Sequence, residues 1–326
     1  MTKRRLTKQQ QARIQRSQKT SKTLSADEHL GPEQTGLVLS HYGQTIEIES
    51  TTGVLFRCFV RKNAEDLVAG DKVTWCPITN KTENTGIVIS RLPRHSLLKR
   101  VNRYKQNKAL AANIDQVIVV FALKPFPSRY YLDQYLVAAE ITKIKPILVL
   151  NKIDLITKES QTAVTALLDE YKAIGYPSLQ VSAKTQDGLA ALQTKLLNKN
   201  SVLLGQSGVG KSSLINQLFD HSLTKVQSLS SASQKGQHTT SASTVYHLSG
   251  GGDIIDAPGI RDFGLWDLSD NEIASGFIEF QPLLSLCQFR NCTHQNEQGC
   301  AIQKAHDEGK ILPFRLASYH RMINED

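Results

Sequence analysis

Residues 205–213 are GQSGVGKSS, which has the spacing of a phosphate-binding loop. The glycines allow the backbone to curl, so that successive N–H groups face phosphate oxygens at the start of the following helix. Lys211 can reach the β- and γ-phosphates, and the Ser212 hydroxyl can bind Mg²⁺. A chance glycine-rich turn is disfavoured, because an apolar stretch precedes the loop and a helical one follows it. We therefore expect a nucleotide at Gly205, Gln206, Ser207, Gly208, Val209, Gly210, Lys211, Ser212 and Ser213.

The stretch NKID at 151–154 ends an apolar strand, where parallel sheets place ligand contacts. Asp154 can accept hydrogen bonds from N1–H and the 2-amino group of guanine, and adenine offers neither donor. Asn151 would bond the other edge of the base, and the Lys152 stem would cover the ring. The tripeptide SAK at 182–184 ends the next strand, where a backbone N–H can serve guanine O6. GTP and GDP are therefore the expected ligands, at Asn151, Lys152, Ile153, Asp154, Ser182, Ala183 and Lys184.

A third pattern, DAPG at 256–259, follows another short apolar strand. Asp256 can hold Mg²⁺ through water, and the Gly259 N–H can bond the γ-phosphate. Between the phosphate loop and this motif lies a serine-rich segment, 228–244, which also suits an ordinary flexible loop. A threonine of this segment would complete the Mg²⁺ shell beside Ser212; we favour Thr240, with Thr239 as the alternative.

The order of these motifs along the chain is unusual. The two guanine-specific stretches precede the phosphate loop, whereas in ordinary GTPases they follow it. A complete set of motifs in the rotated order 4-5-1-2-3 indicates circular permutation. Such rethreading is tolerated because chain termini often lie close together on a domain surface.

Five short β-like runs occupy residues 35–93, the number and spacing of an OB-type barrel, although an SH3-like barrel would look similar. From residue 113 to 265, apolar strands alternate with helical stretches, which predicts a parallel, doubly wound sheet. Helical spacing dominates from 266 to 326. A lysine-rich tail, 1–34, is expected to be disordered until bound, and a basic connector spans 94–112.

The net charge of +9 is concentrated in two strips. Eight basic side chains and no acid lie within residues 1–22, and seven lie within the acid-free stretch 91–108. The strips suggest a nucleic-acid partner, although an anionic membrane or a solvated tail and linker would also fit. With no apolar run long enough to span a bilayer and no secretory signal, we expect a cytoplasmic protein that does not enter membranes.

Three cysteines and a histidine lie within 14 residues, at Cys287, Cys292, His294 and Cys300. Four such ligands can close a tetrahedral, structural Zn²⁺ site. The spacing departs from the usual CxxC pair, so chemistry alone keeps a disulfide as the alternative. A disulfide would pair two of the three cysteines and leave the third as a free thiol. Cys58 and Cys76 lie on expected barrel strands and are interpreted as core residues.

The rotated motifs, the barrel and the Cys/His tail together resemble the RsgA (YjeQ) family of small ribosomal subunit biogenesis GTPases, over about residues 35–320. The resemblance implies a fold with an N-terminal OB-type β-barrel, a central α/β circularly permuted P-loop GTPase domain and a mostly helical zinc-binding domain. It implies the same four zinc ligands, and a barrel that contacts 16S rRNA. The residue after DAPG, Ile260, cannot orient water as a glutamine does. The resemblance instead implies a catalytic histidine, His238, acting with Lys211 and Thr240.

The predicted function is therefore that of a monomeric GTP hydrolase. It would bind the small ribosomal subunit late in assembly, be stimulated by it, and be released on hydrolysis. The alternative is a nucleotide-gated rRNA-binding protein whose hydrolysis is incidental, which Ile260 keeps open. An ATP-dependent enzyme is disfavoured by Asp154.

Overall fold

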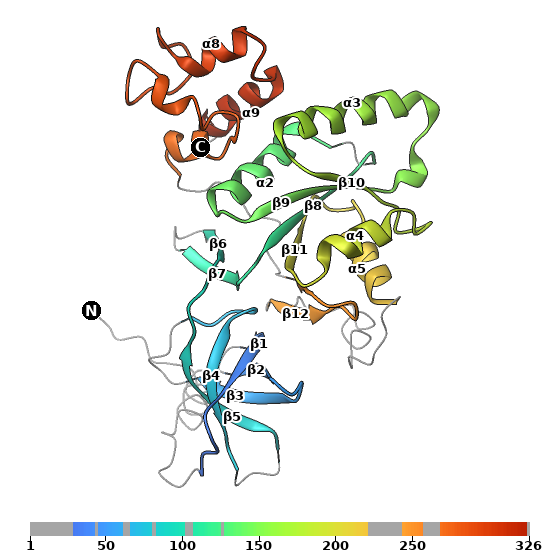
Figure 1. Ribbon diagram of the computed structural model, residues 1–326, viewed down its shortest axis with the longest axis vertical. Helices are drawn as coiled ribbons and strands as arrows, with labels where there is room; N and C mark the ends of the chain where they lie inside the picture. The colour runs from blue at the N-terminus through green and yellow to red at the C-terminus, as the bar shows by residue number, and fades with distance from the viewer. Residues whose placement is uncertain are drawn as a thin grey trace, which may run out of the picture.

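The computed structural model of the chain describes residues 29–42, 45–60, 66–79, 83–101, 107–124, 127–220, 243–256 and 268–324. The molecule is elongated, with a barrel at one end, an α/β domain in the middle and a helical domain at the other end (Figure 1). The expectations for residues 1–28, His238, Thr239, Thr240, Gly259 and Ile260 lie outside the described residues. None of the described helices combines the length and hydropathy that crossing a bilayer requires.

The N-terminal barrel is built from β1 (Gln34–Tyr42), β2 (Thr45–Ser50), β3 (Leu55–Val60), β4 (Lys72–Pro77) and β5 (Thr85–Arg91). The strands follow the order β1-β2-β3-β5-β4, and β4 closes the barrel by pairing with β1. β3 and β5 are parallel and the other pairs antiparallel, a Greek-key arrangement of the OB type. Trp75, Ile46 and Ile48 fill the interior. The five predicted strands and the OB-type barrel are confirmed.

Residues 94–101 and 107–112 are folded against the central domain, whereas one of the two interpretations of this stretch was a solvated linker. They contain β6 (Leu97–Val101) and β7 (Asn107–Ala112), which pair as an antiparallel hairpin. Leu98 and Leu110 are buried in the core of the central domain, together with Ile114. The linker alternative is therefore wrong. Burial of these two leucines offsets the cost of fixing the hairpin backbone.

The central sheet contains β8 (Gln116–Ala122), β9 (Lys145–Asn151), β10 (Ser178–Gln180), β11 (Asn200–Leu204), β12 (Thr244–His247) and β13 (Asp253–Asp256). Its order is β10-β9-β8-β11-β13-β12, parallel except for β12, which is antiparallel to β13. β11, which precedes the phosphate loop, lies in the middle of the sheet although it follows β8, β9 and β10 in the chain. This arrangement is expected of a permuted chain.

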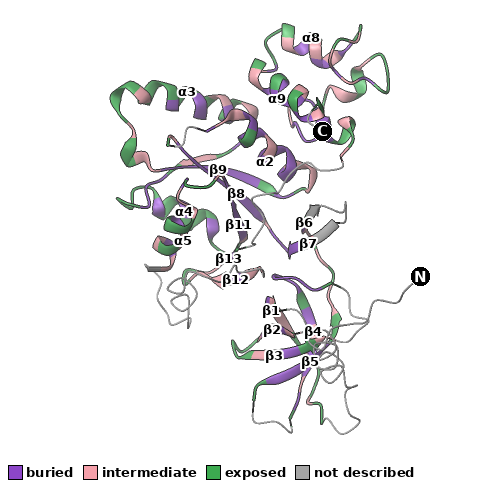
Figure 2. Cartoon of the chain, turned by 180° about the vertical axis from the view of Figure 1, so that it is seen from behind, coloured by how far each residue is buried: buried purple, intermediate pink, exposed green. Residues whose placement is uncertain are grey.

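Helices cover both faces of this sheet, as the doubly wound prediction required. α2 (Arg129–Ile141) and α3 (Lys158–Ile174) pack on one face, against Val117, Val119 and Phe121 of β8. α4 (Leu189–Leu196) and α5 (Lys211–Asp220) pack on the other, against Ile118 and Val120. Alternate β8 residues therefore face opposite layers, and β8 is buried along its whole length (Figure 2).

The barrel continues into the central sheet, since β1 pairs with β12 where Ser40 lies opposite Thr244. At the other end, α7 (Asp270–Ser275), α8 (Ala301–Asp307) and α9 (Pro313–Asn324) form the C-terminal domain. Its core is aromatic, with Phe277 stacked on Phe280 at 4.7 Å between ring centroids and Tyr319 edge-on to both. The predicted helical character of this region is confirmed.

Candidate nucleotide and metal sites

The predicted phosphate loop connects β11 to the first turn of α5. Gly205, Gly208 and Gly210 have φ angles of 140°, 82° and 94°, a region that side chains make costly. A Cβ atom on Gly205 would also collide with the carbonyl oxygen of Val120 on β8. The Lys211 ammonium group donates to the carbonyl oxygens of Gly205 at 2.6 Å and Gln206 at 2.8 Å. The lysine is thus folded over its own loop, at the positive end of α5.

Asn151, the last residue of β9, joins the first guanine motif to this loop. Its side chain is 1% exposed, and its Nδ2 donates to the Val209 carbonyl oxygen at 2.9 Å. Its Oδ1 accepts from the backbone N–H of Ala183 at 3.2 Å. A single buried amide therefore bonds to both other predicted motifs.

Lys152 crosses the same loop. It has a left-handed backbone, with φ at 63°, which turns the chain sharply after β9. Its Nζ donates to the carbonyl oxygens of Gly208 at 2.6 Å and Lys124 at 3.1 Å. The Lys152 side chain is therefore held beside the phosphate loop.

Asp154 lies in the short helix η1 (Ile153–Leu155), exposed at the edge of the sheet. Its Oδ1 accepts from the Ser182 hydroxyl at 2.6 Å, and Ser182 is fully buried. The Ser182 oxygen in turn accepts from the N–H groups of Lys184 and Thr185 at 3.2 and 3.1 Å. This chain of bonds fixes the carboxylate against the SAK loop.

The other residues predicted to bind the nucleotide differ in how far they are exposed to solvent. Ile153 is partly buried against the central core, and Val209 is buried under the loop. Gln206 is partly buried, whereas Ser207, Ser212 and Ser213 are exposed, the last two in the first turn of α5. Asp256 ends β13, the parallel neighbour of β11, and is exposed.

Three contacts of this site were not predicted from the sequence. The carbonyl groups of Lys124 and Gly208 hold Lys152, and Thr185 joins the bonds around Ser182. Backbone carbonyls carry no residue-type signal, so no pattern could have revealed the first two.

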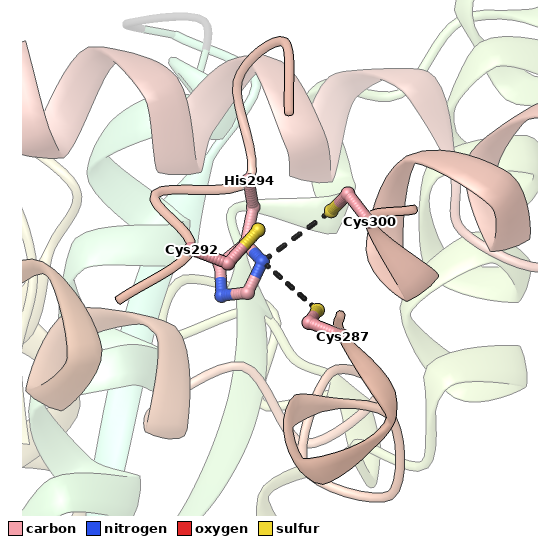
Figure 3. Close-up of side chains that lie close together, drawn as sticks. All are labelled: Cys287, Cys292, His294 and Cys300. Carbon is pink, nitrogen blue, oxygen red and sulfur yellow. Dashed lines mark hydrogen bonds between the residues drawn. The ribbon is translucent and has the colours of Figure 1, made fainter. Parts of the chain in front are cut away.

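The four cysteine and histidine residues predicted to bind metal converge in the C-terminal domain. Their ligand atoms all lie within 4.8 Å of one another. The Sγ atoms of Cys287 and Cys300 lie 3.6 and 3.5 Å from His294 Nδ1, and Cys292 lies alongside (Figure 3). A tetrahedron with Zn–S and Zn–N bonds of about 2.3 and 2.1 Å has S–N edges of roughly 3.6 Å, close to the two distances from His294, so the cluster could hold a metal such as zinc. All five cysteines are free, and the disulfide alternative is not borne out in the structure.

Polar groups outside the cluster fix its loop. Glu297 accepts from the N–H groups of Thr293 and Gln295 at 2.7 and 2.9 Å. Partial burial alone would raise the pKa of Glu297. The hydrogen bonds from the Thr293 hydroxyl and from these N–H groups outweigh burial and lower that pKa to about 2. The Tyr319 hydroxyl donates to the Thr293 carbonyl oxygen at 3.0 Å. The ligand loop is therefore pre-organised by the domain that it would help to stabilise.

Comparison with known proteins gives consistent matches. The family model described as RsgA GTPase matches residues 91–266. A curated protein of Marinobacter nauticus, named small ribosomal subunit biogenesis GTPase RsgA, is 44% identical over 342 residues, covering 100% of this chain and 97% of the relative. A protein of the same name from Ectopseudomonas mendocina is 45% identical over 338 residues, covering 99% and 98%.

Solved structures agree. The crystal structure of YjeQ from Thermotoga maritima superposes with a TM-score of 0.74 at 29% identity, covering 90% of this chain and 98% of that one. YloQ, described as a circularly permuted GTPase, gives a TM-score of 0.71 at 26% identity, covering 92% and 96%. These matches confirm the predicted resemblance and the permuted fold.

Proposed function

The chain belongs to the RsgA GTPase family, and we propose that it hydrolyses GTP to GDP and phosphate while bound to the small ribosomal subunit late in its maturation. One observation carries this proposal. Asn151 and Lys152 of the guanine motif bond to the carbonyl oxygens of Val209 and Gly208 in the phosphate loop. The groups suited to the base and to the phosphates therefore lie at one edge of the sheet, which supports binding of a single guanine nucleotide.

Each part of the site would have its own role. Asp154 would accept from the guanine N1–H and 2-amino groups, with Asn151 and Lys152 beside the base and a backbone N–H of Ser182, Ala183 or Lys184 at O6. The amides of residues 205–213 and Lys211 would hold the phosphates. Asp256 and Ser212 would hold Mg²⁺, which supplies charge compensation for the phosphates. Thr240, Gly259 and the catalytic His238 would complete this site from outside the described residues.

The C-terminal cluster would hold one structural Zn²⁺ through Cys287, Cys292, His294 and Cys300, stabilising the fold without a catalytic role. The partner would be 16S rRNA in the small subunit, contacted by the barrel and the basic strips, with the protein acting as a cytoplasmic monomer. The charge of +9 supports a polyanionic partner.

A turnover assay tests this proposal. We expect slow GTP hydrolysis by the protein alone and a large increase with purified small subunits, an increase that declines as salt rises. Equal rates with and without subunits, at every salt concentration, would contradict it.

A histidine substitution separates this proposal from an rRNA-binding protein with incidental hydrolysis. His238→Ala is expected to lose subunit-stimulated turnover while retaining GTP binding. His221→Ala, which alters a histidine that precedes the segment 228–244, is the control and should keep both. Full stimulated turnover in His238→Ala would favour the alternative or another catalytic residue.

A further inference from the structure

One arginine of the C-terminal domain penetrates the interior of the central domain. Arg315 of α9 is 0% exposed, and its Nη1 donates to Oδ1 of Asp133, on α2, at 2.6 Å. Its Nε and Nη2 donate to the two carboxylate oxygens of Glu279 at 2.6 and 3.2 Å. Asp133 is also 0% exposed and accepts from the Tyr171 hydroxyl of α3 at 2.8 Å. A planar guanidinium with two carboxylates from separate segments fixes their relative geometry more tightly than apolar packing does.

The same face of α2 makes further contacts with the C-terminal domain. The guanidinium of Arg321 lies 3.9 Å from the centre of the Tyr130 ring. Val137 packs closely on Gly276, so a Cβ atom added to Gly276 would lie 2.9 Å from the Val137 carbonyl oxygen. Residues 130, 133 and 137 recur at helical spacing, so they form one stripe along α2.

The opposite stripe of α2 faces the nucleotide loop. Tyr131, Leu132 and Tyr135 line a small cavity whose facing wall includes Gln206 and Val209 of the phosphate loop. These positions lie about half a turn around the helix from the first stripe. α2 is therefore interposed between the C-terminal domain and the phosphate loop (Figure 1).

We propose that Arg315 is a positioning residue of the nucleotide site, which through Asp133 fixes α2 and thereby the phosphate loop that α2 supports. The affinity for guanine nucleotide then depends on attachment of the C-terminal domain. By thermodynamic linkage, bound nucleotide must strengthen that attachment by the same factor. This inference rests on the proposed function, because it concerns the same nucleotide site.

Four variants of the full chain test the inference: Arg315→Met, Arg315→Lys, Asp133→Asn and the control Lys304→Met, which alters an exposed cation of α8. Binding of a fluorescent GDP measures affinity, and transfer of zinc to a chromogenic chelator, with and without saturating GDP, measures attachment of the C-terminal domain. We expect Arg315→Met and Asp133→Asn to weaken GDP binding about fivefold or more, Arg315→Lys less, and Lys304→Met under twofold. GDP should slow zinc release from the wild type and Lys304→Met, but not from Arg315→Met.

A merely structural arginine gives a different result. Replacing such a residue would accelerate zinc release, but GDP affinity would stay as in the wild type and GDP would still slow the release. That result would overturn the inference. If Arg315→Met does not fold, as judged by near-ultraviolet circular dichroism, Asp133→Asn and Arg315→Lys carry the test. Failure of the wild type itself to bind GDP would instead refute the proposed function.

Discussion

The side-chain amide of Asn151 donates to the backbone carbonyl of Val209 at 2.9 Å, across 58 positions of the chain. The same side chain accepts from the Ala183 N–H. One buried residue thus joins three loops that are separate in sequence, and each loop limits where the others can lie. Perturbing any of them should therefore affect nucleotide binding as a whole.

Gly210→Ala tests this relationship from the phosphate loop. A Cβ at Gly210 would collide with Asn151 Nδ2, and its φ of 94° is costly for alanine, by about 1–2 kcal/mol. We expect GTP affinity to fall roughly tenfold or more, with the protein still folded, measured by calorimetric titration. The control is Gly250→Ala, because the space around Gly250 is open. Unchanged affinity in Gly210→Ala would show that the two loops move independently.

Asp154→Asn tests the choice of base. The substitution replaces an acceptor-only carboxylate by an amide, which cannot accept from both guanine donors and can donate to the C2 carbonyl of xanthine. Losing charge-assisted hydrogen bonds costs about 1.5–3 kcal/mol each. We therefore expect GTP binding to weaken at least tenfold and XTP binding to strengthen, in competition assays. Asp187→Asn, in the neighbouring SAK loop, should change neither, and an unaltered GTP preference in Asp154→Asn would contradict the proposed role.

Removal of metal tests the C-terminal cluster. Apolar burial in this small domain centres on Phe277, Phe280 and Tyr319, and structural zinc contributes folding free energy directly. Cys292→Ala is expected to lose the single bound zinc and to lower the thermal midpoint of the C-terminal transition, monitored by the Tyr and Phe signals. Cys76→Ala, which alters a buried barrel cysteine, should retain one zinc per chain. A variant Cys292→Ala with full zinc content would rule out this ligand set.

Much of this architecture could be predicted because its signals are local. The barrel strands alternate apolar and polar residues, and Gly205, Lys211 and Asp154 carry motifs defined by residue type and spacing. The hairpin β6–β7 was not predicted, because the cations around Leu98 and Leu110 are typical of a linker. The pair Arg315–Asp133, 182 positions apart, has no local signal, since its two charges acquire meaning only once α9 packs on α2.

His247 provides a pH test of the contact between barrel and central domain. The imidazole of this β12 residue lies between two carboxylates: its Nδ1 is 2.6 Å from Asp253 of β13, and its Nε2 is 2.8 Å from Glu49 of barrel strand β2. The hydrogen bond to Asp253, with the charges of Asp253 and Glu49, outweighs partial burial and raises the pKa of His247 above 6.5. The charged form therefore favours the folded state.

The stabilisation from His247 is fully present below pH 6.5, and it is lost as the pH rises through the raised folded-state value. We expect His247→Gln to lower the thermal midpoint at pH 6, with the difference from wild type narrowing toward pH 8.5. Because the ring is about one-third exposed, solvent screening should keep the effect to a few degrees and salt should reduce it.

Glu49→Gln should weaken the same pH dependence by removing the barrel carboxylate. His306→Gln, a histidine of α8 remote from the barrel, is the matched control. A difference between wild type and His247→Gln that stays constant from pH 6 to 8.5 would show that the charge of His247 does not hold the two domains together.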